Sequence, residues 1–300
     1  MALRALYDLP APAKLNLFLH VVGRRADGYH LLQSAFVLID WADHLHFERR
    51  EDGRLVRHDL GSPLPDDDLC LRAARALQQA SGSPLGADIH VDKRLPSGAG
   101  LGGGSSDAAT TLLALNRLWG LQWRREPLAA LGLGLGADVP FFVHGRNALV
   151  GGIGEQQRPL PLAPAWYAVL KPAAGIATRE LFAHPALVRD TDPAIVEGSF
   201  KSAGEAGFSL ACLQGFGKND LQAAAEQRCP EVAQAARRLE ARFGNSRMTG
   251  SGSAVFARAG TGATPMASWP DDAPTGELPA GWVARLCRGL DSHPLVGWAD

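Results

Sequence analysis

The feature that most constrains this chain is the glycine-rich stretch at residues 93–109, which reads KRLPSGAGLGGGSSDAA. Five glycines fall within seven residues, and two serines and a helical pattern follow them. Without Cβ atoms, consecutive backbone N–H groups can turn toward one anion. The apolar spacing from Ala108 to Trp119 predicts a helix that ends at Gly120 and is capped by Ser105 or Ser106. Because the loop leads into a helix N-terminus, we expect it to bind phosphate rather than to be a flexible surface loop.

Two other glycine-loop chemistries fit the spacing less well. A Walker loop needs a lysine before its hydroxyl residue, but a glycine precedes Ser105. The dinucleotide spacing G-x-G-x-x-G occurs from Gly98, yet that fold requires a buried parallel strand before the loop. Residues 88–93 instead alternate polar and apolar side chains, as in a half-exposed antiparallel strand, and residues 125–131 predict a second helix. A dinucleotide fold is therefore only a minor alternative.

The segment Pro96–Asp107 resembles the second motif of the galactokinase, homoserine kinase, mevalonate kinase and phosphomevalonate kinase (GHMP) superfamily. The similarity extends from about Pro12 to Phe256 and so covers most of the chain. The resemblance implies an α+β protein of two domains. Residues 1–158 would form an ATP-binding domain similar to the second domain of ribosomal protein S5, and residues 159–300 a ferredoxin-like domain.

The same resemblance implies that main-chain amides of the glycine loop bind the phosphates of ATP, and that Ser105 or Ser106 helps to hold Mg²⁺. Mg²⁺ would bridge phosphate oxygens. The implied phosphate-binding residues are Pro96, Ser97, Gly98, Ala99, Gly100, Leu101, Gly102, Gly103, Gly104, Ser105 and Ser106.

Composition and charge argue against nucleic acid and membranes as partners. The formal net charge is −1, so no overall field attracts nucleic acid or an acidic membrane, and no apolar run approaches a membrane span. The four cysteines lie far apart with no CxxC pair, and the first residues are too short an apolar run for a signal peptide. We expect a cytoplasmic protein with reduced thiols, a monomer or weak homodimer, in which a proline cluster at residues 159–164 marks the domain boundary.

Residues 13–21 predict a strand, because apolar side chains occupy every second position. The period of two places Lys14 and Asn16 side by side, on the face away from the apolar core. A lone strand lysine is usually solvated. The segment is, however, similar to the first motif of the superfamily, which implies that Lys14 lies near the transferred phosphoryl group and Asn16 near the substrate.

Asp138 follows a glycine run at residues 132–136 and precedes Pro140, so it is expected to begin a short helix. Capping alone would explain an aspartate there. The sequence GADVPFF resembles the superfamily segment that supplies the catalytic aspartate. In that role Asp138 would accept the proton of the substrate hydroxyl, and the Lys14 ammonium would keep it ionised.

The remaining substrate contacts are implied by three further resemblances. Asp27-Gly28 predicts a turn, after which Tyr29 and His30 form either a cross-strand aromatic pair or a clamp for a cytosine base. The clamp is typical of the cytidylyl-substrate member of the superfamily, and Phe36 would extend it. Two further segments are similar to superfamily motifs: the segment that begins at Pro172, and residues 248–256, which resemble the third motif. The substrate contacts that they imply are Thr178, Phe182, Gly250 and Gly252.

Simple patterns predict the other elements. Residues 45–58 suggest a hairpin around Asp52-Gly53, residues 69–81 a helix, and residues 145–154 another hairpin. A helix is expected to open at Lys218. Residues 259–281 are rich in proline, glycine and aspartate and predict a long surface loop or disordered segment, followed by a final strand at 282–286.

Together these features predict ATP-dependent phosphoryl transfer to an alcohol. The resemblance implies that the alcohol is the 2-hydroxyl of 4-diphosphocytidyl-2-C-methyl-D-erythritol, a small molecule with a cytidine diphosphate head group. One alternative is a sister kinase for homoserine, mevalonate or a sugar, which shares the loop but does not need the base clamp. The other is a nucleotide-binding module without catalysis, which would not need Lys14 and Asp138 together.

Overall fold

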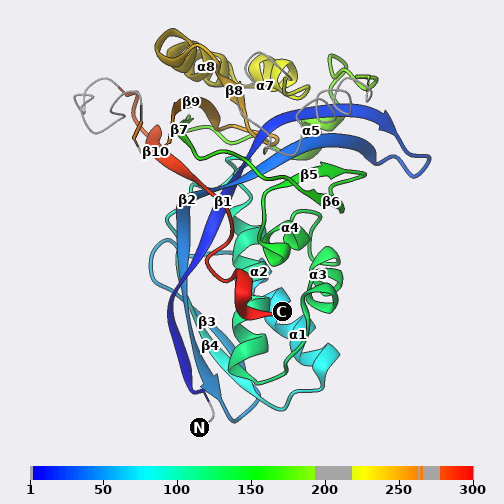
Figure 1. Ribbon diagram of the computed structural model, residues 1–300, viewed down its shortest axis with the longest axis vertical. Coiled ribbons are helices and arrows are strands. Elements are labelled where there is room, and N and C mark those ends of the chain that lie inside the picture. Colours follow the sequence, from blue (N-terminus) through cyan, green and yellow to red (C-terminus); the bar gives the residue numbers. More distant parts are fainter. Residues whose placement is uncertain (1–2, 193–217, 263, 266–277, 300) are drawn as a thin grey trace.

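The computed structural model describes residues 3–192, 218–262, 264–265 and 278–299, and these residues form an elongated molecule built around one mixed sheet (Figure 1). The sheet has ten strands in the order β3-β4-β2-β10-β7-β9-β8, with β1 and β5 also paired to β2 and β6 paired to β5. The strands are β1 (Ala5–Arg24), β2 (His30–Arg50), β3 (Leu55–Asp59), β4 (Gly86–Asp92), β5 (Ala148–Gly151), β6 (Gln156–Pro159), β7 (Ala165–Lys171), β8 (Arg247–Met248), β9 (Val255–Thr261) and β10 (Val283–Leu290).

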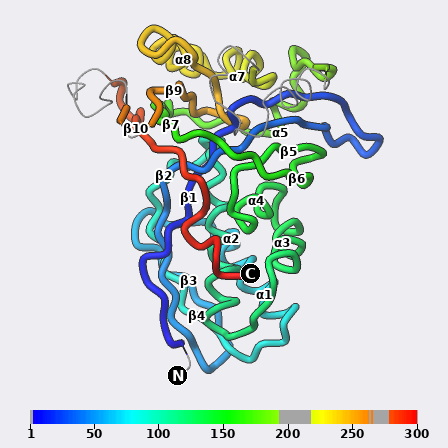
Figure 2. Tube along the Cα trace, viewed as in Figure 1, coloured from blue at the N-terminus to red at the C-terminus, as the bar shows by residue number. Residues whose placement is uncertain are grey.

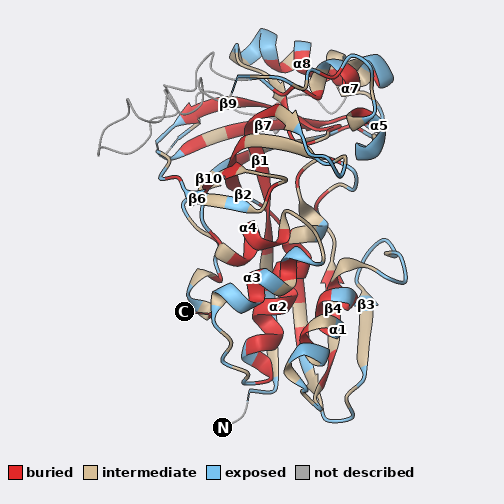
Figure 3. Ribbon diagram, turned by 90° about the vertical axis from the view of Figure 1, so that its right-hand side faces the viewer, coloured by how far each residue is buried: buried red, intermediate tan, exposed pale blue. Residues whose placement is uncertain are grey.

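Helices cover this sheet in two groups (Figures 1 and 3). The helices are α1 (Leu69–Ser81), α2 (Gly103–Leu118), α3 (Arg125–Leu133), α4 (Val139–His144), α5 (Thr178–Phe182), α7 (Gln222–Arg228), α8 (Pro230–Phe243) and the 3₁₀ turn η2 (Val296–Trp298). Helices α1 to α4 bury one core against β2 and β4, and α7 and α8 bury another against β7 and β9. No helix in the described part of the chain is long and apolar enough to cross a bilayer.

The long antiparallel pair β1 and β2 joins the two halves of the molecule, because its strands contribute side chains to all three apolar clusters. Its turn confirms the Asp27-Gly28 prediction: the Arg25 N–H donates to the Tyr29 carbonyl at 2.7 Å, and Gly28 has φ +91°. The predicted strand at residues 88–93 and helix at 69–81 are also confirmed, as β4 and α1.

The strict alternation expected across residues 13–21 is wrong beyond Asn16. The pairing of β1 with β2 shifts register between Asn16 and Leu19, which is the signature of a β-bulge. The extra residue turns Leu19 onto the face of Lys14 and Asn16, where it lines the same cavity, while Phe18 is fully buried with Leu17. That face is not solvated either, since Lys14 is only 4% exposed.

The hairpin expected at residues 45–58 is also wrong. Strand β3 does not pair with β2; β4 lies between them, antiparallel to β2 and parallel to β3. The apolar residues Ala87, Ile89 and Val91 of β4 are fully or almost fully buried, whereas β3 is at best half-buried. The central position therefore goes to the strand with more apolar surface to bury.

Helix α2 begins three to four residues earlier than expected, and neither serine caps it. Its N-cap is Gly102, in the left-handed conformation at φ +75° and with no side-chain cap. The Ser106 hydroxyl is fully buried and donates to the Pro12 carbonyl at 2.7 Å instead. The first helical amides are thus left without a protein side chain to satisfy them.

Two predictions for the C-terminal half need adjustment, and a third is untested. Strand β9 extends to Thr261, so the expected loop does not begin at residue 259, and residues 266–277 of it lie outside the described residues. Helix α7 begins at Gln222 rather than Lys218, because Asn219 first pairs with Leu19 as an isolated bridge. The domain boundary near residue 159 stays a prediction, since β10 pairs with both β7 and β2 and so continues the sheet across it.

After β10 the chain returns to the first group of helices, so the C-terminal end lies beside α2 and α3 (Figure 2). The His293 N–H donates to the Gly145 carbonyl at the end of α4, and Leu295 and Ala299 are buried in the core of α1 to α4. The His293 ring is 1% exposed, accepts the Leu295 N–H at Nδ1, and has no partner for Nε2 among the described residues. Burial, aided by the Arg125 charge, lowers the pKa of His293 to about 3.

This buried ring predicts an acid-sensitive fold. Below the ordinary histidine pKa near 6.5 the unfolded chain takes up a proton that the folded chain does not, so stability falls by about 1.4 kcal/mol per pH unit until the folded pKa is reached. His293→Asn keeps an acceptor but cannot titrate. We expect urea unfolding to show that the variant loses about 2 kcal/mol less stability than the wild type between about pH 7 and pH 5. Equal losses in both proteins would contradict this.

Candidate active site

Two adjoining cavities lie at the junction of the two halves. The first has a volume of about 510 Å³ and is lined by the glycine loop and by residues 64, 65 and 67–69. The second, of about 210 Å³, is lined by Lys14, Asn16 and Asp138 among others. The residues that line both cavities are Gly100, Gly102, Thr178 and Ser251. A ligand in one cavity therefore lies next to a ligand in the other.

The backbone of the glycine loop adopts the left-handed conformations that its glycines allow. Gly98, Gly100 and Gly102 all have positive φ, at +60°, +74° and +75°. These alternating left-handed residues fold the loop back on itself, as in the backbone concavities that bind anions. Every predicted phosphate-binding residue from Pro96 to Ser105 lines the first cavity, and Ser106 does not. Of the two serines proposed for Mg²⁺, only Ser105 is therefore placed to contribute.

The third motif, at residues 248–256, holds this loop in place. The N–H groups of Ser253 and Ala254 donate to the carbonyls of Gly98 and Ala99, both at 3.1 Å. The Asn219 amide donates to the carbonyls of Met248 and Gly250 at 2.8 Å, which fixes the motif in turn. The two glycine-containing segments are therefore in direct contact. Gly250 lines the second cavity, whereas Gly252 lines the first and not the cavity that contains Lys14 and Asp138.

Lys14 and Asp138, 124 residues apart in the sequence, meet in the second cavity. The Lys14 Nζ lies 3.6 Å from Asp138 Oδ2 and donates to Asn16 Oδ1 at 2.5 Å. Burial lowers the pKa of Lys14, and Asp138 opposes that shift by favouring the ammonium form. Asp138 does occupy the N-cap position of α4, but its carboxylate makes no capping hydrogen bond. Capping therefore does not account for its side chain, which is 31% exposed and faces the cavity.

Two polar residues that contact Asn16 were missed by the sequence argument: Ser34, which lines this cavity, and Thr249, which lies behind Asn16 and does not line it. The Asn16 amide donates to Ser34 Oγ at 2.9 Å, and the Asn16 N–H donates to Thr249 Oγ1 at 2.9 Å. Ser34 and Thr249 thus fix the orientation of Asn16 beside Lys14. Both lie far from Asn16 in sequence. The facing position of Ser34 on β2 could have been found only from the strand register.

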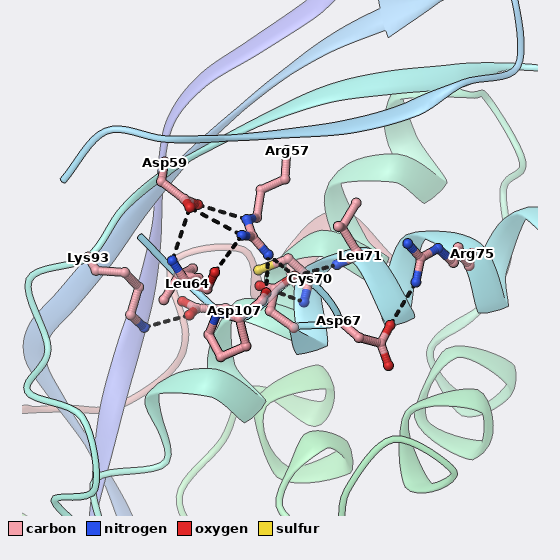
Figure 4. Close-up of polar contacts among 11 residues, drawn as sticks. Arg57, Asp59, Leu64, Asp67, Cys70, Leu71, Arg75, Lys93 and Asp107 are labelled. Atoms are coloured by element: carbon pink, nitrogen blue, oxygen red, sulfur yellow. Dashed lines mark hydrogen bonds and ion pairs between the residues drawn. The ribbon is translucent and has the colours of Figure 1, made fainter. Parts of the chain in front are cut away.

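A buried ionic cluster borders the first cavity and was also missed. The Lys93 ammonium contacts Asp107 Oδ2 at 2.6 Å and pairs with Asp43, whose other oxygen accepts the N–H groups of Arg94 and Leu95. Burial raises the pKa of Asp107 to about 8; Lys93 opposes this shift and Asp43 adds to it. Lys93 and Asp107 flank the glycine loop on either side, so this cluster anchors both of its ends (Figure 4).

The opposite wall of the first cavity is fixed by Arg57 (Figure 4). Its guanidinium pairs with Asp59 at 2.7 Å and Asp68 at 2.9 Å, and donates to the carbonyls of Leu64 and Pro65. The Asp68 carboxylate also accepts the N–H groups at the start of α1. Although Asp68 lines the cavity, its carboxylate is thus occupied by structural contacts.

The predicted base clamp is only partly assembled. Phe36 and Phe182 line the second cavity together with Thr178, whose hydroxyl is hydrogen-bonded to Ser251 Oγ at 2.6 Å. His30 does not line it, but its ring stacks on Phe182 with centroids 4.9 Å apart. Tyr29 is 62% exposed at the turn and lines neither cavity. Its role against a base stays a prediction.

The comparison with known proteins agrees with this geometry. The family model for the GHMP kinase N-terminal domain matches residues 68–146, and that for the GHMP kinase C-terminal domain matches residues 193–265. Proteins called 4-diphosphocytidyl-2-C-methyl-D-erythritol kinase from Methylibium petroleiphilum and Verminephrobacter eiseniae are 63% and 56% identical to this chain. The matches cover 100% of both chains in the first case and 99% of both in the second.

Solved structures agree with this family assignment and with the fold. A crystal structure of 4-(cytidine 5'-diphospho)-2C-methyl-D-erythritol kinase is 37% identical, with a TM-score of 0.68 over 86% of this chain and 90% of that one. A homoserine kinase from Cytophaga hutchinsonii, 15% identical, also has a TM-score of 0.68, over 96% of this chain and 95% of that one, and shares the fold. The α+β fold inferred from the sequence is thereby confirmed, and the chain belongs to the 4-diphosphocytidyl-2-C-methyl-D-erythritol kinase family of the GHMP kinases.

Proposed function

We propose that this kinase transfers the terminal phosphoryl group of ATP to the 2-hydroxyl of 4-diphosphocytidyl-2-C-methyl-D-erythritol. The observation that carries the proposal is the pair of cavities that meet at Gly100 and Gly102, with Lys14 and Asp138 in the second. ATP would occupy the larger cavity, with its phosphates on the loop amides, and the alcohol would occupy the smaller one. The names of the two relatives described above, which are 63% and 56% identical, support this choice of alcohol.

Asp138 is the group best placed to receive the hydroxyl proton. Its carboxylate makes no capping bond and faces the cavity, so it is free to accept a hydrogen bond from an alcohol and orient the oxygen for attack. As the hydroxyl loses its proton, negative charge develops between the alcohol oxygen and the phosphoryl group. The Lys14 ammonium, which is buried and held by Asn16, stabilises that charge.

The backbone of the glycine loop supplies the rest of the charge stabilisation. The amides of Gly103, Gly104 and Ser105 belong to the first turn of α2 and have no intrahelical partner, and these residues line the first cavity. Phosphoryl transfer depends mainly on such positioning and electrostatic stabilisation. The Lys93–Asp43–Asp107 cluster would keep these amides in place while the nucleotide binds.

The residues present also fit Mg²⁺ carried by the nucleotide. Mg²⁺ takes most of its ligands from phosphate oxygens and water, with one or two from the protein. Within the described residues no group of three histidine, cysteine or acidic side chains could hold a metal, so a dedicated protein cage is not the arrangement found there. Ser105, at the edge of the first cavity, would supply a protein oxygen. Bound there, Mg²⁺ would neutralise charge on the phosphate oxygens.

The test is an acceptor screen with purified protein, ATP and Mg²⁺. We expect phosphorylation of 4-diphosphocytidyl-2-C-methyl-D-erythritol, identified by mass spectrometry, and at least about a hundredfold lower kcat/KM with homoserine, mevalonate or galactose. A higher kcat/KM with one of these alcohols would replace the proposed substrate. Nucleotide binding without transfer to any of them would favour the non-catalytic module.

A further inference from the structure

Arg189, in the segment that follows α5, connects the two sides of the predicted base clamp. Its Nε donates to His30 Nε2 at 3.3 Å, which ties this segment to the start of β2. Its terminal nitrogens donate to the carbonyls of Phe182 at 3.0 Å, His184 at 3.1 Å and Leu187 at 3.0 Å. One guanidinium therefore holds both the imidazole of His30 and the backbone of Phe182. The rings of these two residues stack on each other.

The contact with Arg189 determines where His30 carries its proton. A guanidinium can only donate hydrogen bonds, so His30 Nε2 must be the accepting nitrogen. In a neutral imidazole the proton then resides on Nδ1, which becomes a donor. The charges that act on His30 come from Arg189 and from Arg24 on β1, and they add to burial in lowering its pKa.

We propose that Arg189 is the positioning residue of the base site: it fixes His30 as the Nδ1–H tautomer and fixes Phe182 against it, so that His30 presents a hydrogen-bond donor to the pyrimidine. The inference rests on the proposed cytidine diphosphate substrate. Cytosine offers two acceptors, the carbonyl oxygen O2 and the ring nitrogen N3, on the edge that such a donor can reach. Uracil carries a proton on N3, so a donor aimed at that atom would reject it.

This role differs from a general structural one. If Arg189 merely stabilised the segment after α5, its loss would lower stability and impair all kinetic constants together. If Arg189 instead fixes the tautomer of His30, its loss should weaken only the binding of the base. The ATP cavity and the Lys14–Asp138 pair do not include Arg189 and should be unaffected.

The test compares Arg189→Met with Arg24→Met. Both variants remove a cation near His30, but Arg24 donates through Nε to the Gly28 carbonyl at 3.1 Å rather than to the imidazole. Two-bond ¹H–¹⁵N spectra distinguish the two tautomers of a neutral histidine, and the His30 signal is identified by its loss in His30→Gln. We expect the Nδ1–H form in the wild type and in Arg24→Met, and a mixture of tautomers in Arg189→Met.

Kinetics provide the second readout. We expect Arg189→Met to raise the KM for 4-diphosphocytidyl-2-C-methyl-D-erythritol by about tenfold, which is the effect of one weakened hydrogen bond, with kcat and the KM for ATP within about twofold. The substrate KM should also become pH-dependent near about pH 6.5, where an unlocked histidine titrates. Arg189→Lys, which retains a donor, should recover part of the loss.

Two results would overturn the inference: an unchanged His30 tautomer in Arg189→Met, or a parallel decline in stability and in every kinetic constant that Arg189→Lys does not relieve. Failure of the proposed function would look different. In that case the wild type would not phosphorylate the cytidylyl substrate, while the tautomer spectra, recorded without substrate, would still decide the role of Arg189.

Discussion

Asp138→Asn is expected to lower kcat by about a thousandfold while leaving the KM for ATP within about twofold. Asparagine keeps the size of the side chain but can neither accept the hydroxyl proton nor pair with the Lys14 ammonium 3.6 Å away. The nucleotide cavity does not include Asp138, so ATP binding should persist. Stopped-flow and steady-state transfer assays measure kcat, and equilibrium binding of a fluorescent nucleotide measures affinity.

Two controls separate chemistry from folding. Because Asp138 makes no capping bond, Asp138→Asn should leave the midpoint of thermal unfolding almost unchanged. Lys14→Met should cost a comparable factor in kcat, and the double variant should be little worse than either single one, since the two groups act on one developing charge. If Asp138→Asn retained more than about a tenth of wild-type kcat, Asp138 would not be the base.

The short-range pattern of the chain placed both members of this pair on their elements, but the family resemblance identified Lys14 and Asp138 as catalytic. A period of two placed Lys14 and Asn16 on one face, and the structure joins them by a hydrogen bond of 2.5 Å. A glycine run followed by a proline placed Asp138 at the start of a short helix, where α4 does begin. Their meeting did not follow from periodicity; it followed from the family resemblance, because no local rule connects residues 14 and 138.

The errors arose where long-range packing overrides a local rule. The bulge in β1 depends on its pairing with β2, and it moves Leu19 into the site and Phe18 out of it. Serine is a better helix cap than glycine in isolation, but the N-cap of α2 is Gly102 because the loop needs a left-handed residue there. Likewise, the position of β4 between β2 and β3 reflects which strand has more apolar surface to bury.

Gly100→Ala is the second substitution with a large expected effect, because the two glycine motifs touch at this residue. A Cβ on Gly100 would lie 2.2 Å from the Thr249 carbonyl oxygen and 2.9 Å from the Gly252 nitrogen, and its φ is +74°. The third motif would have to move away from the loop. We expect a loss of about 2–5 kcal/mol in the free energy of unfolding and at least a tenfold increase in the KM for ATP.

Gly98→Ala is the matched control, since it separates backbone strain from collision. Its φ of +60° is almost the same, but the nearest atom to its added Cβ, the Gly175 Cα, is 3.8 Å away. The free energy of unfolding of this variant should therefore fall by only about 1–2 kcal/mol, which is the cost of an alanine in the left-handed conformation. Its affinity for ATP should stay largely intact. Urea unfolding and ATP titration of both variants measure the difference.

Equal losses in the two variants would mean that positive φ alone determines the cost, and that contact between the two motifs does not shape the phosphate site. A larger loss in Gly100→Ala would show that the third motif, far away in sequence, sets the position of the loop amides.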